Sequence, residues 1–472
     1  MNQILIKNGT IITMNPDREI IESGSVLIKD NKIAQVSKDE IKVNNDTCVI
    51  DANRKVILPG LIDCHTHAGH TMVKSLGVGK SNDWVDACLK IYSSGSSLSF
   101  WETDASLSAL EKIKAGVTSS LILFGGGTDL LRSDNPDYAV SYAKSFGENG
   151  IKGIVAVGPN RPPYPTMFYD KENNKPVESS LDNQLDVTEH LVNNIKSVQN
   201  NRVSFCVSAP KFFPEEMDDD NLSKSVAYMY NKVMDLRSQN NLIFTQDGHK
   251  EGSISISDKF NALGEWALLS HSITLSDEDL KSIKKHKPTI VHNPSSNYSI
   301  MGRCPVPELL DEGIRVVIGS DGAAPDRGFD MFRHMSQCMH YHRRHFEDTT
   351  ILPPGKVLEM VTIDAAEALG LGSELGSIET GKVADIILID MFKPHLLPMN
   401  MPVTRLAHYA NAADVNSVIV NGEIIMLDRK VLKVNELDIL EKTEEESKKM
   451  LSENNLNHLT NIPDNFWKKS RL

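Results

Sequence analysis

The sequence of 472 residues is poor in cysteine, and the few cysteines it has are not paired along the chain. Its 6 cysteines are scattered and form no Cys-x-x-Cys motif, which argues against both a disulfide framework and a thiolate zinc site. No stretch approaches the roughly 20 apolar residues of a membrane span, and no apolar segment follows a basic one at the start. We therefore expect reduced thiols, no membrane partner and a cytoplasmic location.

Positive charge is also scarce relative to negative charge. Lys and Arg total 50 against 63 Asp and Glu, which gives a formal net charge of −13. A protein that binds a nucleic-acid backbone needs clustered basic residues, so we expect no nucleic-acid partner and instead a small-molecule substrate. The sequence contains no Gly-x-Gly-x-x-Gly or Walker A motif, which leaves a nucleotide cofactor without support.

Short strands are predicted near both ends of the chain. The first group is Gln3 to Lys7, Thr10 to Met14, Ser25 to Lys29 and Lys32 to Ser37, with a turn at Lys7-Asn8-Gly9; the second is Ala384 to Asp390, Val415 to Val420 and Glu423 to Met426, with a hairpin turn at Asn421-Gly422. We expect the two groups to form one discontinuous β-sandwich domain from residues 1–57 and 376–435. A barrel at 58–375 would be inserted between them, and a helical tail would occupy 436–472.

The middle of the chain alternates apolar runs with amphipathic stretches, a pattern typical of βα units around a parallel sheet. The candidate buried strands are Gly60 to Cys64, Ser119 to Phe124, Gly153 to Val157, Val203 to Ser208, Leu242 to Gln246, Trp266 to Ser270, Thr289 to His292 and Val316 to Gly319. Eight such runs, each followed by room for a helix or loop, favour a closed (β/α)8 TIM barrel of the α/β class over an open sheet.

Two histidines follow the first of these runs. His65 and His67 alternate along a strand, so both side chains can point the same way and bind one metal ion. The last run ends at Asp321, and a carboxylate there is costly unless it caps a helix or is paired or metal-bound. Because barrel active sites lie at the carboxyl ends of the strands, we favour a metal ligand for all three residues.

Longer strings surround these residues: PGLIDCHTH, LLSHSITLSDEDL, VHNPSSN, GSDGAAPDRGFDMF and LGSIETGKVADIILID. With them the chain resembles the amidohydrolase superfamily, in the branch of triazine hydrolases and of guanine, methylthioadenosine and adenosylhomocysteine deaminases. The resemblance implies that His65, His67 and Asp321 bind one Zn²⁺ or Fe²⁺ ion, with zinc favoured. It also implies a homodimer or a higher homo-oligomer.

The same resemblance assigns roles to three further residues. His271, at the end of the sixth predicted strand, would contact the reacting water or the substrate. His292 and Asn293 would lie near the substrate at the rim of the barrel.

The fifth predicted strand departs from the family pattern. Relatives usually end it with His-x-x-Glu, whereas this chain has Thr-Gln246-Asp-Gly248-His249-Lys-Glu251. A gapless comparison makes Gln246 the ligand and His249 the proton shuttle, and Gly248 supports it because a turn begins there. A shifted loop makes His249 the ligand and Glu251 the acid/base. We favour the shift because imidazole binds zinc far better than a neutral amide, and we keep Gln246 as a substrate contact.

Two further residues are candidates for substrate binding. Lys211 follows the fourth strand, where many of the deaminases carry a histidine, and could contact an anionic or carbonyl group. A carbamylated lysine that bridges two metals and a lysine without a role are the alternatives. Arg161 ends the third strand and is either an anchor for a polar substrate or a structural loop residue.

Four histidines lie between Arg333 and His345, where a helix should follow the eighth strand. They fall on several faces of that helix, so we assign the segment to a surface or subunit-contact helix rather than to a metal site.

Together these features predict a metal-dependent hydrolase. A zinc or ferrous ion lowers the pKa of water toward neutrality, Asp321 would accept a proton from it, His271 would orient it, and Glu251 or His249 would protonate the departing amine. We expect hydrolysis of the exocyclic C–N bond of a purine, pterin, pyrimidine or triazine. The alternatives are another leaving group, such as chloride or that of a cyclic amide, and a barrel that has lost turnover and only binds.

Overall fold

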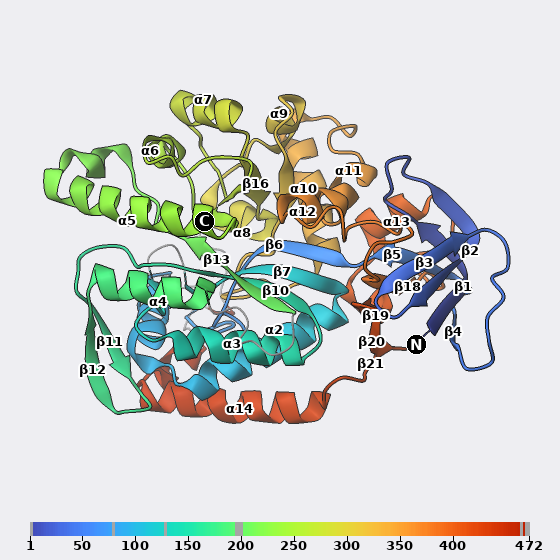
Figure 1. Ribbon diagram of the computed structural model, residues 1–472, viewed down its shortest axis with the longest axis horizontal. Helices are drawn as coiled ribbons and strands as arrows, with labels where there is room; N and C mark the ends of the chain where they lie inside the picture. The colour runs from blue at the N-terminus through green and yellow to red at the C-terminus, as the bar shows by residue number, and fades with distance from the viewer. Residues whose placement is uncertain (1–2, 78–80, 127–129, 194–201, 463–465, 468–472) are drawn as a thin grey trace.

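The computed structural model describes residues 3–77, 81–126, 130–193, 202–462 and 466–467. In these ranges, eight parallel strands lie side by side in chain order and form an almost closed barrel (Figure 1). They are β6 (Leu61–His67), β7 (Val117–Leu123), β10 (Lys152–Val157), β13 (Val203–Ser208), β14 (Phe244–Gln246), β15 (Ala267–Ser270), β16 (Thr289–His292) and β17 (Val316–Ile318). The predicted (β/α)8 barrel is therefore confirmed.

The first and last barrel strands meet through their carboxyl ends. The backbone N–H of Asp321 donates to the carbonyl of His65 over 2.9 Å, and the hydroxyl of Thr66 donates to the carbonyl of Asp321 over 3.1 Å. These bonds bring the two strand ends that carry predicted metal ligands into direct contact.

Helices surround the barrel and follow its strands. Eight of them are α2 (Leu98–Lys114), α3 (Pro136–Glu148), α4 (Leu181–Asn193), α5 (Asp220–Gln239), α6 (Ser253–Lys259), α7 (Asp277–His286), α9 (Val306–Asp311) and α10 (Met331–Phe346). The sequence sets their ends: α7 begins at a capping box in which the Ser276 side chain accepts from the N–H of Asp279, and it ends in two lysines and a histidine. Other helices are α1 (Ser81–Lys90), α8 (Pro294–Ser296), α11 (Pro354–Glu359), α12 (Ile363–Ala368) and α13 (Pro402–Tyr409).

A second sheet combines both ends of the chain. Within the described ranges it has nine strands: β1 (Gln3–Ile12), β2 (Ile20–Lys29), β3 (Lys32–Ser37), β4 (Cys48–Asp51), β5 (Lys55–Pro59), β18 (Ile386–Asp390), β19 (Val415–Val420), β20 (Glu423–Leu427) and β21 (Lys430–Val431). β5 pairs antiparallel with β18, which joins the N-terminal and C-terminal halves. The domain boundaries proposed from the sequence stay a prediction.

Two predicted turns in this sheet had different outcomes. The turn at Asn421-Gly422 is confirmed, because both residues have positive φ, 54° and 72°, and connect β19 to β20. The turn at Lys7-Asn8-Gly9 is wrong, because β1 runs through it as one strand. Asn8 has φ 65° and the register shifts beside it, so the segment is a bulge inside the strand.

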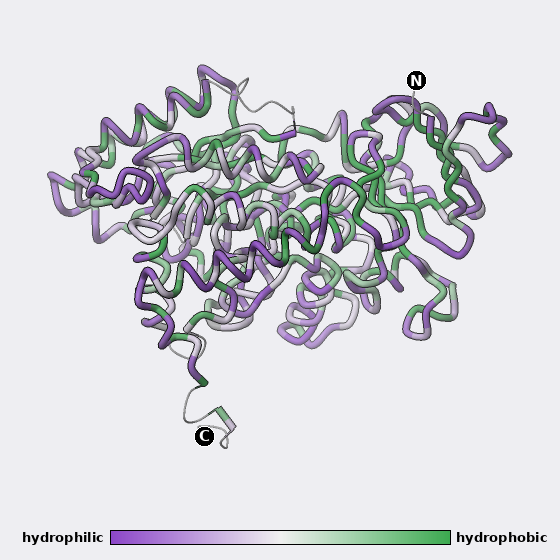
Figure 2. Tube along the Cα trace, turned by 90° about the horizontal axis from the view of Figure 1, so that it is seen from below, coloured by the Kyte–Doolittle hydropathy of each residue, from purple (hydrophilic) through white to green (hydrophobic). Residues whose placement is uncertain are grey.

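The C-terminal helix α14 (Glu436–Glu453) lies along α2 on the outside of the barrel (Figure 1). Glu446 on this helix is buried and accepts hydrogen bonds from the hydroxyls of Ser97 and Ser99. Figure 2 shows hydrophobic residues concentrated along the strands where the small sheet meets the barrel, with hydrophilic residues along the outer helices. Among the described residues, the longest helices lack the continuous apolar stretch that would be needed to cross a membrane.

Candidate metal centre

Ionisable side chains converge at the carboxyl ends of the barrel strands. The cluster consists of His65 and His67 at the end of β6, Asp247 directly after β14, His271 directly after β15, and Asp321 after β17. All are buried. The parallel strands of a barrel end at one mouth, so residues distant in the sequence meet there.

The distances within the cluster match those between ligands of one ion. An Asp247 oxygen lies 3.2 Å from Nε2 of His65 and 3.2 Å from Nε2 of His271, and an Asp321 oxygen lies 3.2 Å from Nε2 of His67. Zinc ligands about 2.0–2.2 Å from a shared tetrahedral ion lie about 3.4 Å apart. Among the described residues Nε2 of His65 has no hydrogen-bond partner, so it faces the Asp247 oxygen without hydrogen-bond geometry. The donor set therefore fits a divalent metal ion.

Hydrogen bonds on the far sides of two rings determine which nitrogen faces the cluster. Nδ1 of His67 lies 3.0 Å from the carbonyl oxygen of Gly125, and Nδ1 of His271 lies 2.8 Å from Oδ1 of Asn297. Both oxygens can only accept, so each Nδ1 carries a proton and Nε2 is the ring nitrogen that faces the cluster. Contacts of this kind orient metal-binding histidines.

The charges in the cluster stabilise one another. Burial alone would raise the pKa of Asp247, but the charge of His65 and a hydrogen bond from His271 outweigh it and hold that pKa well below its ordinary value. Burial lowers the pKa of His67, yet the carboxylates of Asp321 and Asp247 raise it overall to about 9. Both carboxylates therefore stay ionised and supply the negative charge that a cation requires.

Asp247 was not predicted from the sequence as a metal ligand. Asp247 occupies the fifth-strand position in the cluster for which Gln246 or His249 was predicted. The criterion that selected Asp321, an acid after an apolar strand, applies equally to Asp247 and could have found it. With Asp247 beside the histidine pair, the chain has Asp247-x-x-Lys250 in place of His-x-x-Glu. A carboxylate thus replaces an imidazole, and an ammonium group replaces a carboxylate.

Gln246 points away from the cluster. Its amide donates to the carbonyls of Ala209 and Pro210 over 3.2 and 3.1 Å and accepts from the hydroxyl of Ser257 over 2.8 Å. The side chain therefore links β14 to the loop after β13 and to α6. This position explains Gln246 as a structural residue, and its predicted contact with substrate stays untested.

His249 and Glu251 lie beyond the cluster along the same loop. His249 is buried with Nδ1 3.0 Å from the Ser253 hydroxyl, and burial together with the Lys211 charge lowers its pKa to about 3. Glu251 is exposed in the turn before α6. Neither belongs to the groups of converging ligand atoms found among the described residues. Their predicted roles as ligand and acid/base stay predictions that this geometry does not favour.

A cavity of about 570 Å³ opens in front of the cluster. Its described walls include His67, His70, Trp84, Cys88, Lys211, Asp247, Lys250, His271, Ile273, Asp321 and Arg327. This volume suits a drug-sized or nucleoside-sized ligand. Lys211 lines the cavity, and its predicted contact with a substrate stays a prediction. Lys250 and Arg327 add two cationic side chains that the sequence did not single out.

Three other predicted substrate contacts are absent from the walls that the structure describes. Arg161 forms an ion pair with Glu216 and donates to the carbonyl of Lys211 over 2.6 Å, so it holds the loop that carries Lys211. His292 and Asn293 are buried behind the cavity at the end of β16.

The loop after β6 is held by a residue that the sequence did not reveal. Asp104 on α2 is buried, and its carboxylate accepts from the backbone N–H groups of Gly69, Thr71 and Met72 over 2.6, 2.9 and 3.1 Å. Asp104 therefore fixes the path of the chain as it leaves the histidine pair.

Comparisons with known proteins identify the family and the fold. The model of the amidohydrolase family matches residues 56–425. A 5′-deoxyadenosine deaminase of Methanosarcina mazei is 27% identical over 461 residues, which cover 96% of this chain and 99% of that protein. An adenosine deaminase structure from Xanthomonas campestris with bound zinc gives a TM-score of 0.77 at 17% identity, covering 96% of this chain and 99% of that one.

A second solved structure is that of an enzyme with a different activity. The atrazine chlorohydrolase of Arthrobacter aurescens, complexed with zinc, gives a TM-score of 0.75 at 19% identity and covers 95% of this chain and 100% of that one. At these identities the structural likeness shows the fold alone.

Proposed function

The chain belongs to the amidohydrolase family, and from this we propose that it is a metal-dependent hydrolase that removes an exocyclic amino group from a purine-like heterocycle. The observation that carries the proposal is the convergence of three imidazoles and two carboxylates beside a cavity of about 570 Å³. The deaminase relatives support the choice of an amino leaving group.

The metal would be held by His65, His67, Asp247 and Asp321, with His271 beside it. When bound, a divalent ion lowers the pKa of a water molecule and so supplies a nucleophile at neutral pH. Zinc is the first candidate because histidine and carboxylate ligands suit it, and ferrous iron is the alternative. A homodimer and a cytoplasmic location complete the proposal, and sedimentation and cell fractionation test them.

The reaction adds the oxygen of one water to the ring carbon and breaks the bond from that carbon to the amino nitrogen. One proton of the water ends on a ring nitrogen, and the other leaves with ammonia. Asp321 accepts a proton from the water, and Nε2 of His271, which lies 3.6 Å from an Asp321 oxygen, orients the attack.

Lys250 is our candidate for the group that protonates the departing amine. It lines the cavity three residues after Asp247, where the family pattern has a glutamate. Its backbone is anchored, because its N–H donates to the Ser253 hydroxyl over 3.0 Å and the residue forms a β-bridge with Ile273. An ammonium group can deliver a proton to a leaving nitrogen. Lys250 and Glu251 are both exposed, but of the two only Lys250 lines the described cavity.

The positively charged side chains that line the cavity suggest the charge of the substrate. A divalent ion bound to two carboxylates is electrically neutral overall, and Lys250 and Arg327 then add positive charge to the cavity. Such a site attracts a ligand that carries a carboxylate or a phosphate. We therefore propose a purine-like substrate with an acidic substituent.

The absence of a glutamate at position 250 favours a second candidate function. Ammonia needs a proton as it leaves, whereas chloride leaves without one. A site that lacks the glutamate of the family pattern could therefore hydrolyse a carbon–halogen bond, which is the activity named for the chlorohydrolase neighbour. A barrel that only binds its ligand is the remaining alternative.

The test is a screen of the zinc-loaded and iron-loaded protein against neutral and acidic aminopurines, pterins and chlorinated triazines. We expect ammonia release from an acidic aminopurine, loss of that release with a chelator, and recovery on adding metal. Chloride release alone would support the second candidate. Tight metal binding without any turnover would support the binding barrel and contradict both hydrolase proposals.

A further inference from the structure

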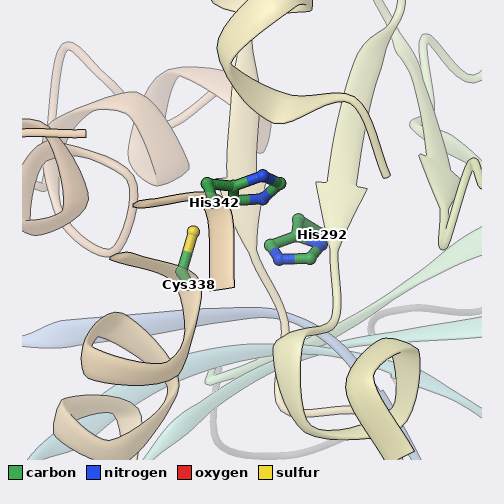
Figure 3. Close-up of side chains that lie close together, drawn as sticks. All are labelled: His292, Cys338 and His342. Atoms are coloured by element: carbon green, nitrogen blue, oxygen red, sulfur yellow. The ribbon is translucent and has the colours of Figure 1, made fainter. Parts of the chain in front are cut away.

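A second group of potential metal ligands lies behind the cavity. One ligand atom each from His292, Cys338 and His342 lies within 4.8 Å of the others, and all three side chains are buried. Figure 3 shows these side chains facing a common space, with His292 coming from the end of β16 and the other two from α10. None of them belongs to the cluster around Asp247 and Asp321.

The helix that carries two of these residues differs from the expectation. The segment from Arg333 to His345 was assigned to a surface or subunit-contact helix, and this is wrong for one of its faces. His342 and Cys338 are buried, as is His334, whereas His340 and His345 are exposed. Cys338 and His342 are four residues apart, so they lie one above the other on the face of α10 that covers β16.

The buried imidazole of His342 lacks hydrogen-bond partners among the described residues. It is fully buried, and neither ring nitrogen has a hydrogen-bond partner in the described parts of the chain. A buried polar group without a partner costs about 1–3 kcal/mol. The ring lies 5.4 Å from the ring of His292, measured between centroids. Nε2 of His292 lies 3.2 Å from the Tyr298 hydroxyl, a contact that an ion shared by the two imidazoles would replace.

We infer that His292, Cys338 and His342 form a second metal site, distinct from the proposed catalytic centre, for a thiophilic ion of the Zn²⁺ or Cu⁺ class. One thiolate and two imidazoles are donors that both ions accept. Zinc with sulfur at about 2.3 Å and nitrogen at about 2.0–2.1 Å brings such donors to about 3.6 Å from each other. Binding releases the thiol proton of Cys338 to solvent, and the metal–sulfur bond takes its place.

This second site is connected to the first one by a single side chain. Nδ2 of Asn297 lies 3.3 Å from Nδ1 of His292, while Oδ1 of the same amide lies 2.8 Å from Nδ1 of His271. An ion that fixes His292 therefore also fixes Asn297, and through it the orientation of His271. The second ion would tie α10 to β16 and position His271 without touching the substrate.

The test uses the full chain with His65→Ala and His67→Ala, which removes the first site and leaves the second. After chelation, the protein is loaded with Zn²⁺ or with Cu⁺ under reducing conditions, separated from free ion, and analysed for metal. We expect one ion per chain. Whichever of the two loading experiments, with Zn²⁺ or with Cu⁺, leaves the ion bound identifies the metal. Loading with Co²⁺ should give a thiolate-to-cobalt absorption band in the near ultraviolet.

The variants Cys338→Ser and His342→Gln should lose both the retained ion and the cobalt band. Cys206→Ser is the matched control, because Cys206 is a buried thiol on β13 outside the group and should leave both unchanged. Circular dichroism checks that each variant folds, and two variants are used so that one folding failure leaves a test. Absence of the band in the parent, or its persistence in Cys338→Ser, overturns the inference whether or not the chain is a hydrolase.

Discussion

The ammonium group of Lys112 lies 2.5 Å from the carboxylate of Asp63, and both side chains are fully buried. The same carboxylate accepts from the backbone N–H of Ser320 over 2.9 Å and from its hydroxyl over 2.7 Å. Asp63 precedes His65 by two residues, and Ser320 directly precedes Asp321. The Asp63 carboxylate therefore joins β6 to the segment that follows β17, beneath the ligands that both carry, and Lys112 on α2 balances its charge.

Replacing Lys112 with methionine should destabilise the fold strongly. The substitution keeps most of the volume but leaves the Asp63 carboxylate buried without its cationic partner, which costs about 4 kcal/mol of unfolding free energy. Chemical denaturation followed by circular dichroism measures this loss.

Lys114→Met is the matched control on the same helix. Lys114 pairs with Glu436 at 2.7 Å, but both side chains are partly exposed, at 27% and 38%. Such pairs contribute at most about 1 kcal/mol. Equal losses of unfolding free energy for the two variants would show that the buried Lys112 pair stabilises the fold no more than the exposed Lys114 pair.

Gly319→Ala should disturb the metal centre without adding charge. A Cβ atom at this position would lie 2.8 Å from Cβ of His65 and 2.5 Å from Oδ1 of Asn293. Crowding of this kind costs about 1–3 kcal/mol and would push β6 outward. We expect lower metal content and a lower melting temperature. Gly355→Ala, where nothing lies within 4 Å of the added atom, should change neither.

Asp247 should be required for the metal, and Glu251 should not. Asp247→Ala removes a buried carboxylate that lies 3.2 Å from two imidazoles. Changes to residues that only support metal ligands already lower metal affinity about tenfold or more, so we expect at least that loss here. Asp247→His restores the residue type of the family pattern and should retain metal. Glu251→Gln, on the exposed turn, is the control. The assignment fails if Glu251→Gln loses metal while Asp247→Ala keeps it.

Lys250 should affect turnover more than binding. Lys250→Met removes the proposed proton donor, and we expect kcat to fall by about 10²–10⁴-fold. Lys250→Arg keeps the positive charge but cannot give up a proton readily, so KM should stay near the parent value while kcat still falls. If arginine restores kcat, the side chain contributes charge and not a proton.

The barrel and much of its mouth could be predicted because their signals are local. His65 and His67 follow an apolar strand directly, and the long shared strings fix the order of the remaining strands. The end of this strand was predicted at Gln246, where β14 does end, and Asp247 was missed because the preference for an imidazole ligand favoured His249 over the acid directly after the strand. Successive side chains along extended backbone point to opposite sides, so Gln246 turns outward to Ala209 and Asp247 turns inward.

Other features depend on contacts between distant segments. The burial of one face of α10 follows from its position against β16, and a helix rich in histidine and arginine gives no sign of it in isolation. The bulge at Asn8 was predicted as a turn because Asn-Gly favours positive φ in both settings. Only pairing with β2 along its whole length distinguishes the two.

The pairing of β5 with β18 has a consequence for biosynthesis. β5 leaves the ribosome roughly 300 residues before its neighbour, which at about 5–20 residues per second is a delay on the order of tens of seconds. During that interval the nascent chain presents an open apolar edge of the kind that recruits other strands. Translation must therefore approach completion before β18 can cover the edge of β5. Prematurely terminated chains lack β18 and are the ones most exposed to aggregation.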